Sequence, residues 1–157
     1  MDGNDAPSGM GIHRWDLRDP AAALTGIARR HQLRPGMVIV GLIELPDTIQ
    51  HLLDTTVLYD ADEPPDEARH CAVLIRRAAH RLFGPRVVIG TPRHAFLTVV
   101  VRRGPLRLSS ADRRWWEGWR QAEHKLPVFD GTLVVMTEQG WRSADDQLVG
   151  FQPALAA

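Results

Sequence analysis

The apolar residues of this chain form short continuous runs, which predict strands, and stripes at helical spacing, which predict helices. Residues 37–45 (MVIVGLIEL) are the clearest run, because they are apolar, rich in β-branched residues and bounded by Pro-Gly and Pro46. Shorter runs of the same kind predict further strands at residues 55–59, 86–89, 95–101 and 132–137. We therefore expect a sheet, with Glu44 as the one ionisable residue of its clearest strand.

Other segments carry apolar residues at helical spacing. One helix is expected to begin at Asp19-Pro20, an N-cap followed by a first-turn proline, and to end before Pro35. A second should begin at residues 64–67 (PPDE) and end at Gly84-Pro85. Its apolar stripe consists of Cys71, Ile75, Ala78 and Leu82. A short helix capped by Asp47 is also expected, with an apolar side made of Ile49, Leu52 and Leu53.

The most detailed segment, residues 99–141, contains a tryptophan-rich helix. Ser109 and Asp112 have the spacing of a capping box, which predicts that the helix begins beside them. The residues expected on its buried side are Trp115, Trp119, Ala122 and Leu126, with Trp116 at the border of the stripe. We expect the helix to end at the next proline, His124 to face away from the core, and Gly118 to permit close packing.

Helices interleaved with short strands predict a single α/β (or α+β) domain, a sandwich in which helices flank one mixed sheet. The 157 residues are enough for one hydrophobic core, and the sequence shows neither an internal repeat nor a second core. We place this domain at residues 12–151. Residues 1–11 (MDGNDAPSGMG) have little to bury and are expected to be a disordered tail, and residues 152–157 a C-terminal tail.

The composition argues against several classes of protein. Lys plus Arg and Asp plus Glu balance at 19 each, so no net charge attracts nucleic acid or an anionic membrane. The single cysteine excludes an internal disulfide framework and a multi-cysteine zinc site, and suits a reducing compartment. No apolar run has the length of a membrane span, and the N-terminus lacks a signal peptide's apolar region. We expect a cytoplasmic protein without a membrane partner, and the oligomeric state stays open.

Few side chains have the spacing of a catalytic or metal site. None of the seven histidines forms an HxH or HExxH pair, and no phosphate-binding loop or nucleophile elbow occurs. His94 is the best candidate among the histidines because it lies between a proline and a strand. Glu44 lies near the end of a buried strand, where a carboxylate is costly unless it is paired or exposed, so it marks either a site or the point where the strand reaches the surface. One hypothesis is therefore a hydrolase that uses Glu44, His94 and Asp112 around a metal or a water. We rank it second, and we expect no cofactor and a Cys71 that fills the core.

Arginines are concentrated between residues 102 and 120, although the chain as a whole is neutral. Together with a tryptophan at the border of its helix's apolar stripe, they form a candidate partner-binding surface. Its residues are Arg102, Arg103, Arg107, Arg113, Arg114, Trp116 and Arg120. Guanidinium groups also neutralise phosphates, and an exposed ring stacks on a base, so the partner is either a protein, which we favour, or a nucleic acid.

The same segment resembles the JAB/MPN (JAMM) fold and, within it, the RadC-like branch. That branch has a metal loop of the form H-x-H-P-S-G, followed by S-x-x-D at the head of a helix. In an ungapped alignment Gly104 matches the loop glycine, Ser109 the serine and Asp112 the metal-binding aspartate. The position of Asp130 before an apolar run and the upstream order of strand pair, helix, strand and loop are also similar, and Glu44 would stand near the family's catalytic glutamate.

The metal-binding histidines of that family are absent here. Their positions hold Val99 and Val101, and the following proline and serine positions hold Arg102 and Arg103. Valine has no lone pair to give a metal, and a catalytic zinc needs three protein ligands. The resemblance therefore implies a metal-free relative, in which the S-x-x-D residues remain as a helix cap. Our first hypothesis is a non-catalytic binding or regulatory domain that holds a partner on its arginine- and tryptophan-rich surface.

Overall fold

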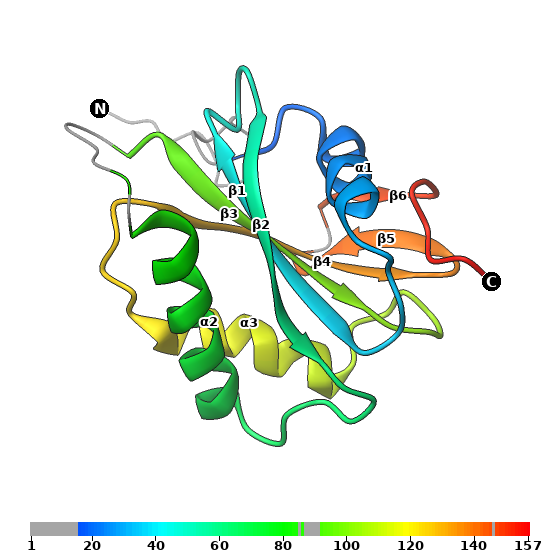
Figure 1. Cartoon of the computed structure of the whole chain (residues 1–157). Coiled ribbons are helices and arrows are strands. Elements are labelled where there is room, and N and C mark those ends of the chain that lie inside the picture. Colours follow the sequence, from blue (N-terminus) through cyan, green and yellow to red (C-terminus); the bar gives the residue numbers. More distant parts are fainter. Residues whose placement is uncertain (1–15, 85, 87–91, 146) are drawn as a thin grey trace, which may run out of the picture.

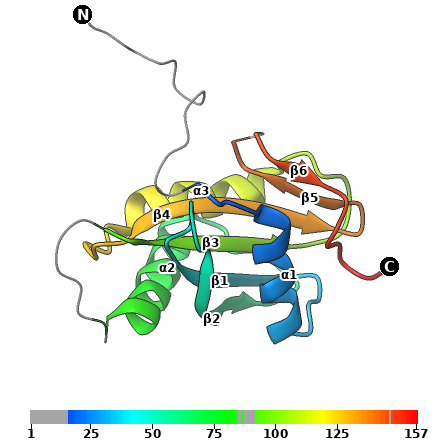
Figure 2. The ribbon, with the colours of Figure 1, turned by 90° about the horizontal axis from the view of Figure 1, so that it is seen from above.

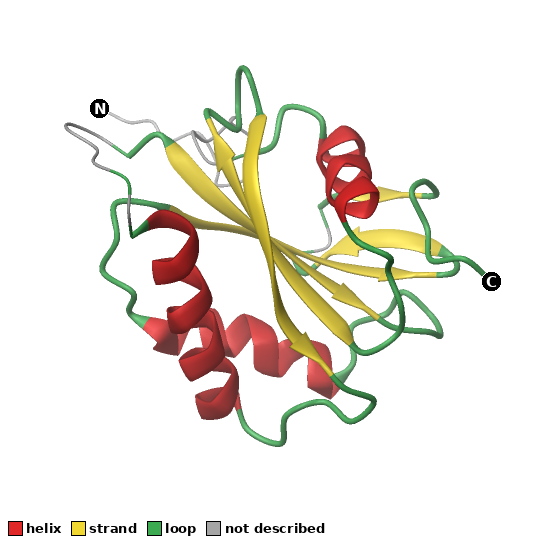
Figure 3. Ribbon diagram, in the orientation of Figure 1, coloured by secondary structure: helices red, strands yellow, loops and turns green. Residues whose placement is uncertain are grey.

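The protein folds around a six-stranded sheet with helices on both of its faces (Figure 1, Figure 3). The computed structural model describes residues 16–84, 86, 92–145 and 147–157. The strands are β1 (Met37–Glu44), β2 (His51–Asp60), β3 (His94–Val101), β4 (Phe129–Thr137), β5 (Gly140–Ser143) and β6 (Val149–Gly150). The helices are α1 (Pro20–Arg30), α2 (Ala68–Phe83) and α3 (Ser110–Ala122). The predicted α/β sandwich around a mixed sheet is confirmed.

The sheet is mixed because one pair of neighbouring strands is parallel. The strand order is β2-β1-β3-β4-β5-β6, in which β3 and β4 are parallel and the other neighbours are antiparallel. A parallel pair needs a crossover connection, and α3 provides it between β3 and β4. All eight residues of β3 are buried, as expected for an inner strand covered on both faces. The arginine- and tryptophan-rich segment therefore belongs to the central β3-α3-β4 unit.

The helices α2 and α3 cover one face of the sheet, and α1 covers the other (Figure 2). Side chains of β3 alternate between the two faces, as the geometry of a strand requires. Phe96 and Val100 belong to the core beneath α2 and α3, whereas Leu97, Val99 and Val101 belong to the core beneath α1. The two valines at the family's histidine positions are thus ordinary core residues.

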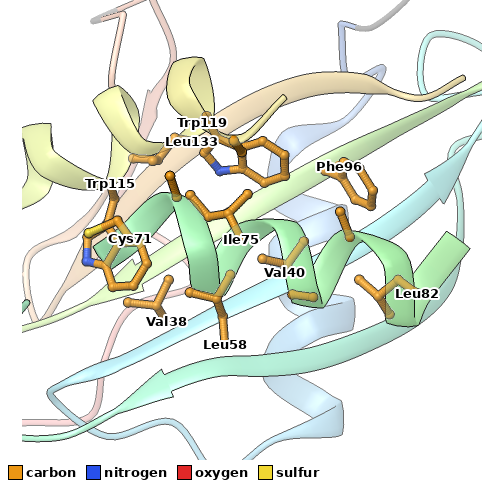
Figure 4. Close-up of a cluster of buried hydrophobic side chains, with 14 of the residues drawn as sticks. Val38, Val40, Leu58, Cys71, Ile75, Leu82, Phe96, Trp115, Trp119 and Leu133 are labelled. Atoms are coloured by element: carbon orange, nitrogen blue, oxygen red, sulfur yellow. The ribbon is translucent and has the colours of Figure 1, made fainter. Parts of the chain in front are cut away.

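The contact between α2 and α3 is so close that only a glycine fits at one point. A Cβ atom on Gly118 of α3 would lie 2.7 Å from the Cβ atom of Cys71 in α2, which is shorter than a van der Waals contact. Figure 4 shows Cys71 among the buried side chains of this core, with Trp115 and Trp119 of α3 nearby. The expected role of Gly118 in close packing is confirmed.

The connection between β1 and β2 is a tight turn, so the short helix predicted after Asp47 was wrong. Leu45 and Gln50 have positive φ angles of 49° and 54°, and the N–H groups of Thr48 and Gln50 donate to the Leu45 carbonyl oxygen. Residues 51–53 belong to β2, which is longer than the predicted strand. Ile49, Leu52 and Leu53 do have helical spacing. However, hydrogen bonds to the adjacent β1 hold residues 51–53 in the extended conformation of a strand.

The end of α3 also differs from the sequence pattern. The helix ends at Ala122, one turn earlier than predicted, because Glu123 adopts the left-handed conformation and redirects the chain. His124 consequently points inward and is 8% exposed, so the prediction that it faces away from the core was wrong. Leu126 lies in the loop after the helix and is half-buried against the same core. The predicted buried positions within the helix are confirmed for Trp115, Trp119 and Ala122.

The C-terminal residues pack against the sheet, although the sequence analysis assigned residues 152–157 to a tail. Leu155 is 5% exposed, and its N–H donates to the Thr137 carbonyl oxygen at 3.0 Å. The indole N–H of Trp141 donates to the Gln152 carbonyl oxygen at 2.9 Å. The folded domain therefore extends past residue 151. The tail predicted at residues 1–11 and most of the strand predicted at residues 86–89 lie outside the described residues.

Candidate functional site

A capping box fixes the start of α3 and with it the arginine-rich segment. The Ser109 hydroxyl accepts a hydrogen bond from the Asp112 N–H at 3.1 Å, and the Asp112 carboxylate accepts one from the Ser109 N–H at 2.9 Å. These bonds satisfy N–H groups that have no partner within the helix. The predicted capping box is confirmed. Asp112 is 1% exposed, so its negative charge needs a compensating partner.

Arg102, the residue after β3, is that partner. Its guanidinium group donates to both carboxylate oxygens of Asp112, at 3.1 Å from Nε to Oδ1 and 2.8 Å from Nη2 to Oδ2. The remaining N–H groups donate to the carbonyl oxygens of Arg103, Pro105 and Arg107, at 3.1, 2.9 and 2.8 Å. Arg102 therefore uses all five of its donors inside the protein and holds the loop before α3 in shape. It is a structural residue and not part of a free binding surface.

Three other arginines of the segment line a groove beside α3, which we call the arginine groove. Its volume is about 420 Å³. The lining residues are Arg107, Leu108, Arg113, Trp116, Glu117, Arg120, Arg142 and Ala144. Four arginines thus face one glutamate, around a half-buried tryptophan that packs against the core of α2 and α3. The sequence analysis missed Arg142, because this residue reaches the groove only through the antiparallel pairing of β4 with β5.

The charge of the arginine groove is available to a ligand. Arg107, Arg113 and Arg120 are exposed, and their guanidinium groups make no hydrogen bond or ion pair with any residue that the structure describes. Guanidinium groups clustered without matching carboxylates create a positive local potential, and their planar forks bind carboxylates or phosphates in a bidentate manner. The groove therefore favours an anionic ligand.

The remaining two arginines of the predicted surface lie elsewhere. Arg114 is half-buried and donates to the Pro65 carbonyl oxygen at 2.7 Å, so it ties α3 to the segment before α2. Arg103 is exposed at a second pocket of about 310 Å³, on another side of the α3 N-terminus. The walls of that pocket are mainly apolar and include Val38 and Trp115. The structure thus separates the predicted surface into a groove and three arginines outside it, Arg102, Arg103 and Arg114.

Glu44 and His94, two residues of the catalytic hypothesis, are neighbours in the sheet. The antiparallel ladders pair Glu44 of β1 with His94 of β3 on one side and with His51 of β2 on the other. The Glu44 carboxylate lies 3.6 Å from Nη2 of Arg93 and 3.9 Å from Nδ1 of His51. The carboxylate is about one-third exposed, with 32% of its side-chain surface accessible. Its charge is therefore satisfied by an exposed ion pair at the end of β1.

The His94 imidazole is buried, and its Nδ1 atom makes no hydrogen bond with the protein. The ring of Phe83 packs against it edge-on, with ring centroids 5.2 Å apart. Burial lowers the pKa of His94 below its ordinary value, and Arg86 and Arg93 lower it further, while the negative charge of Glu44 acts in the opposite direction. The imidazole is therefore neutral at pH 7.

Asp112, the third residue of the catalytic hypothesis, lies near the opposite end of β3. His94 is the first residue of β3, whereas Asp112 is bound to Arg102, which follows the last residue of that strand. At about 3.3 Å per residue, these ends are separated by roughly 25 Å. The structure brings Glu44 and His94 together but does not bring Asp112 to them.

A histidine–aspartate pair, His124 and Asp130, follows the C-terminal end of α3. The sequence analysis did not single out this pair. Nε2 of His124 lies 2.8 Å from Oδ1 of Asp130, an arrangement that also orients catalytic histidines. However, Nδ1 of His124 accepts a hydrogen bond from the Leu126 N–H at 3.0 Å. An imidazole whose Nδ1 accepts carries its proton on Nε2, so both ring nitrogens are engaged in structural bonds. His124 is therefore not a candidate general base.

Two further kinds of catalytic feature are a reactive cysteine and a cluster of metal ligands, and the described part of the chain shows neither. Cys71 is buried, and burial raises the pKa of its thiol to about 11, so the thiol stays protonated at neutral pH. Among the described residues, no group of three or more His, Cys, Asp or Glu side chains is arranged to hold a metal ion. The described helices include none that is long and apolar enough to cross a bilayer.

Comparison of this chain with known proteins gives no matching family model, no matching curated protein and no matching solved structure.

Proposed function

We propose that this protein is a non-catalytic binding domain that holds an acidic segment of a protein partner in the arginine groove. The observation that carries the proposal is the set of four arginines around Trp116 in a groove open to solvent. Tryptophan and arginine dominate the binding energy of protein interfaces, and arginine pairs with carboxylates through two parallel hydrogen bonds. The proposal leaves out Arg102 and Arg114, because their donors are used within the domain.

The proposal of a non-catalytic role is supported by the partners of the side chains considered for catalysis. Both oxygens of the Asp112 carboxylate accept hydrogen bonds from Arg102, and one also accepts from the Ser109 N–H. Glu44 and His94 remain as a pair at the far end of β3, and hydrolysis by these two residues alone is the alternative. Stoichiometric metal in the purified protein that disappears in Asp112→Ala would contradict the non-catalytic proposal.

We further propose a metal-free relative of the JAB/MPN (JAMM) fold, located in the cytoplasm. In support, the β1–β2 pair, α2, β3, a loop and a capped α3 follow one another in the order that the resemblance implies. In this proposal the guanidinium of Arg102 supplies the positive charge beside Asp112 that a metal supplies in the family, so the loop keeps its shape without a metal. The single cysteine, buried as a free thiol, suits a reducing compartment.

The binding proposal is tested with a fluorescently labelled acidic peptide of glutamate and leucine residues and two double variants. Arg113→Glu with Arg120→Glu reverses two charges in the arginine groove. Arg69→Glu with Arg77→Glu makes the same change at exposed positions of α2 and serves as the matched control. Fluorescence anisotropy should show peptide binding to the wild-type and control proteins, and binding weaker by about tenfold or more in the groove variant. Equal weakening in both variants, or no binding to the wild type at low salt, would refute the proposal.

A further inference from the structure

The arginine groove continues past α3 into two further depressions, with volumes of about 150 and 300 Å³. Adjoining depressions have lining residues in common. The arginine groove and the second depression share Trp116, Arg120 and Ala144, and the second and third share Asp16, Thr132 and Asp145. Because neighbouring depressions share lining residues, they adjoin one another in a row, and we call this row the long groove. It begins beside α3, passes the start of β4 and the residues after β5, and reaches the segment before α1.

The charge of the lining residues reverses along the long groove. The arginine groove has four arginines against one glutamate. The second depression has three aspartates against one arginine, and so has the third. The aspartates of these two depressions are Asp16, Asp47, Asp130 and Asp145. One end of the long groove is therefore positive and the other negative, with Trp116 between them.

Neutral donors, not cations, hold two of these carboxylates in place. Asp130 is bonded to Nε2 of His124, which is a neutral imidazole because its Nδ1 is an acceptor. Asp145 accepts hydrogen bonds from the Ser143 hydroxyl at 2.6 Å and from the Gln147 N–H at 3.1 Å. Hydrogen bonds from neutral groups orient a carboxylate without cancelling its charge. The negative end is therefore a preorganised feature of the fold.

We infer that the long groove binds an extended polypeptide segment with acidic side chains toward one end and basic side chains toward the other. This inference rests on the proposed function and specifies the partner. The acidic end lies beside Arg107 and Arg113, an apolar or aromatic side chain contacts Trp116, and the basic end lies beside Asp130 and Asp145. Three depressions in a row suit an extended chain better than a compact ligand, since an extended peptide advances about 3.3 Å per residue and presents successive side chains to successive sites.

A nucleic acid fits only part of the long groove. Single-stranded nucleic acid carries a negative charge on every nucleotide, so a strand that follows the groove past Trp116 brings phosphates against the aspartates. Like charges placed opposite each other across an interface oppose binding. The sequence left protein and nucleic acid open as partners, and the charge reversal selects a protein segment.

The experiment compares three labelled peptides of equal length on the full chain by fluorescence anisotropy, each with a central tryptophan. The segregated peptide has glutamates on one side of the tryptophan and lysines on the other, the alternating peptide has the same residues in alternating order, and the acidic peptide has glutamates only. A labelled oligothymidylate is the polyanion probe. Asp47→Asn with Asp130→Asn removes two of the four negative charges of the negative end, and asparagine keeps an acceptor oxygen for His124.

We expect the segregated peptide to bind about fivefold more tightly than the other two peptides. In the Asp47→Asn/Asp130→Asn protein this advantage should become smaller, while the acidic peptide binds at least as tightly as before. If the acidic peptide binds the wild type as tightly as the segregated one, the inference is overturned and the proposed function stands. If no peptide binds, the proposed function itself fails. Tighter binding of oligothymidylate than of the segregated peptide overturns both.

Discussion

Arg102 and Asp112 form a bidentate ion pair that joins the end of β3 to the start of α3, with the aspartate 1% exposed. The same guanidinium group also donates hydrogen bonds to three carbonyl oxygens of the loop between these elements. One of them belongs to Arg107, whose side chain lines the arginine groove. A buried charge pair thereby positions an exposed binding residue.

Removing one member of this pair should destabilise the fold strongly. In Arg102→Ala the Asp112 carboxylate remains buried without a counter-charge, and the free energy of unfolding should fall by about 3–5 kcal/mol. Asp112→Ala removes both the pair and the carboxylate half of the capping box, the bond from the Ser109 N–H, so the double variant should lose less than the sum of the single losses. Urea-induced unfolding measures each value. Arg103→Ala, an exposed neighbour, is the control, and strictly additive losses would contradict this account.

Gly118 should not tolerate even a methyl group. Alanine favours a helix over glycine by up to about 1 kcal/mol, but the added Cβ atom would collide with the Cβ atom of Cys71 at 2.7 Å. Both atoms are fixed by their backbones, so α2 and α3 must separate. We expect Gly118→Ala to lower the free energy of unfolding by about 1–3 kcal/mol. Gln121→Ala, at an exposed position of the same helix, is the matched control in thermal unfolding, and a stabilised Gly118→Ala protein is the opposite result.

The buried imidazole of His94 should make stability depend on pH. Its folded-state pKa lies below the ordinary value of 6.5, so the unfolded chain takes up a proton at a higher pH than the folded protein does. This contribution to stability is therefore complete above pH 6.5 and is lost as the pH falls from 6.5 toward the folded-state pKa. Burial and the nearby Arg30 also lower the pKa of His31, which adds a second contribution of the same sign.

The measurement is the free energy of unfolding as a function of pH between 7 and 5. The charged groups that shift the pKa of His94 are Glu44, Arg86 and Arg93, and all three are kept in the variant His94→Gln. His94→Gln should flatten the dependence while His31→Gln removes a separate part of it. A slope in His94→Gln equal to that of the wild type would show that the imidazole does not carry the effect.

Several features of this protein follow from residues close together in the chain. The apolar run at β1, the stripe of α2 and the capping box of Ser109 and Asp112 are recognisable in the sequence because their physical causes are local. A strand buried on both faces needs a continuous apolar run, and a helix cap needs a side chain within three residues of the N–H that it satisfies. Such patterns are sufficient for the α/β class and for most of its elements.

The candidate site depends on contacts between distant segments. Arg102 is one arginine among several in the sequence, and only its approach to the buried Asp112 separates it from the exposed arginines. Arg142 reaches the arginine groove through the pairing of β5 with β4, and Asp47 becomes part of the negative end through the fold of the β1–β2 connection. Local sequence patterns establish the elements, whereas burial of charge and the pairing of strands decide which arginines hold the fold together and which remain available to a partner.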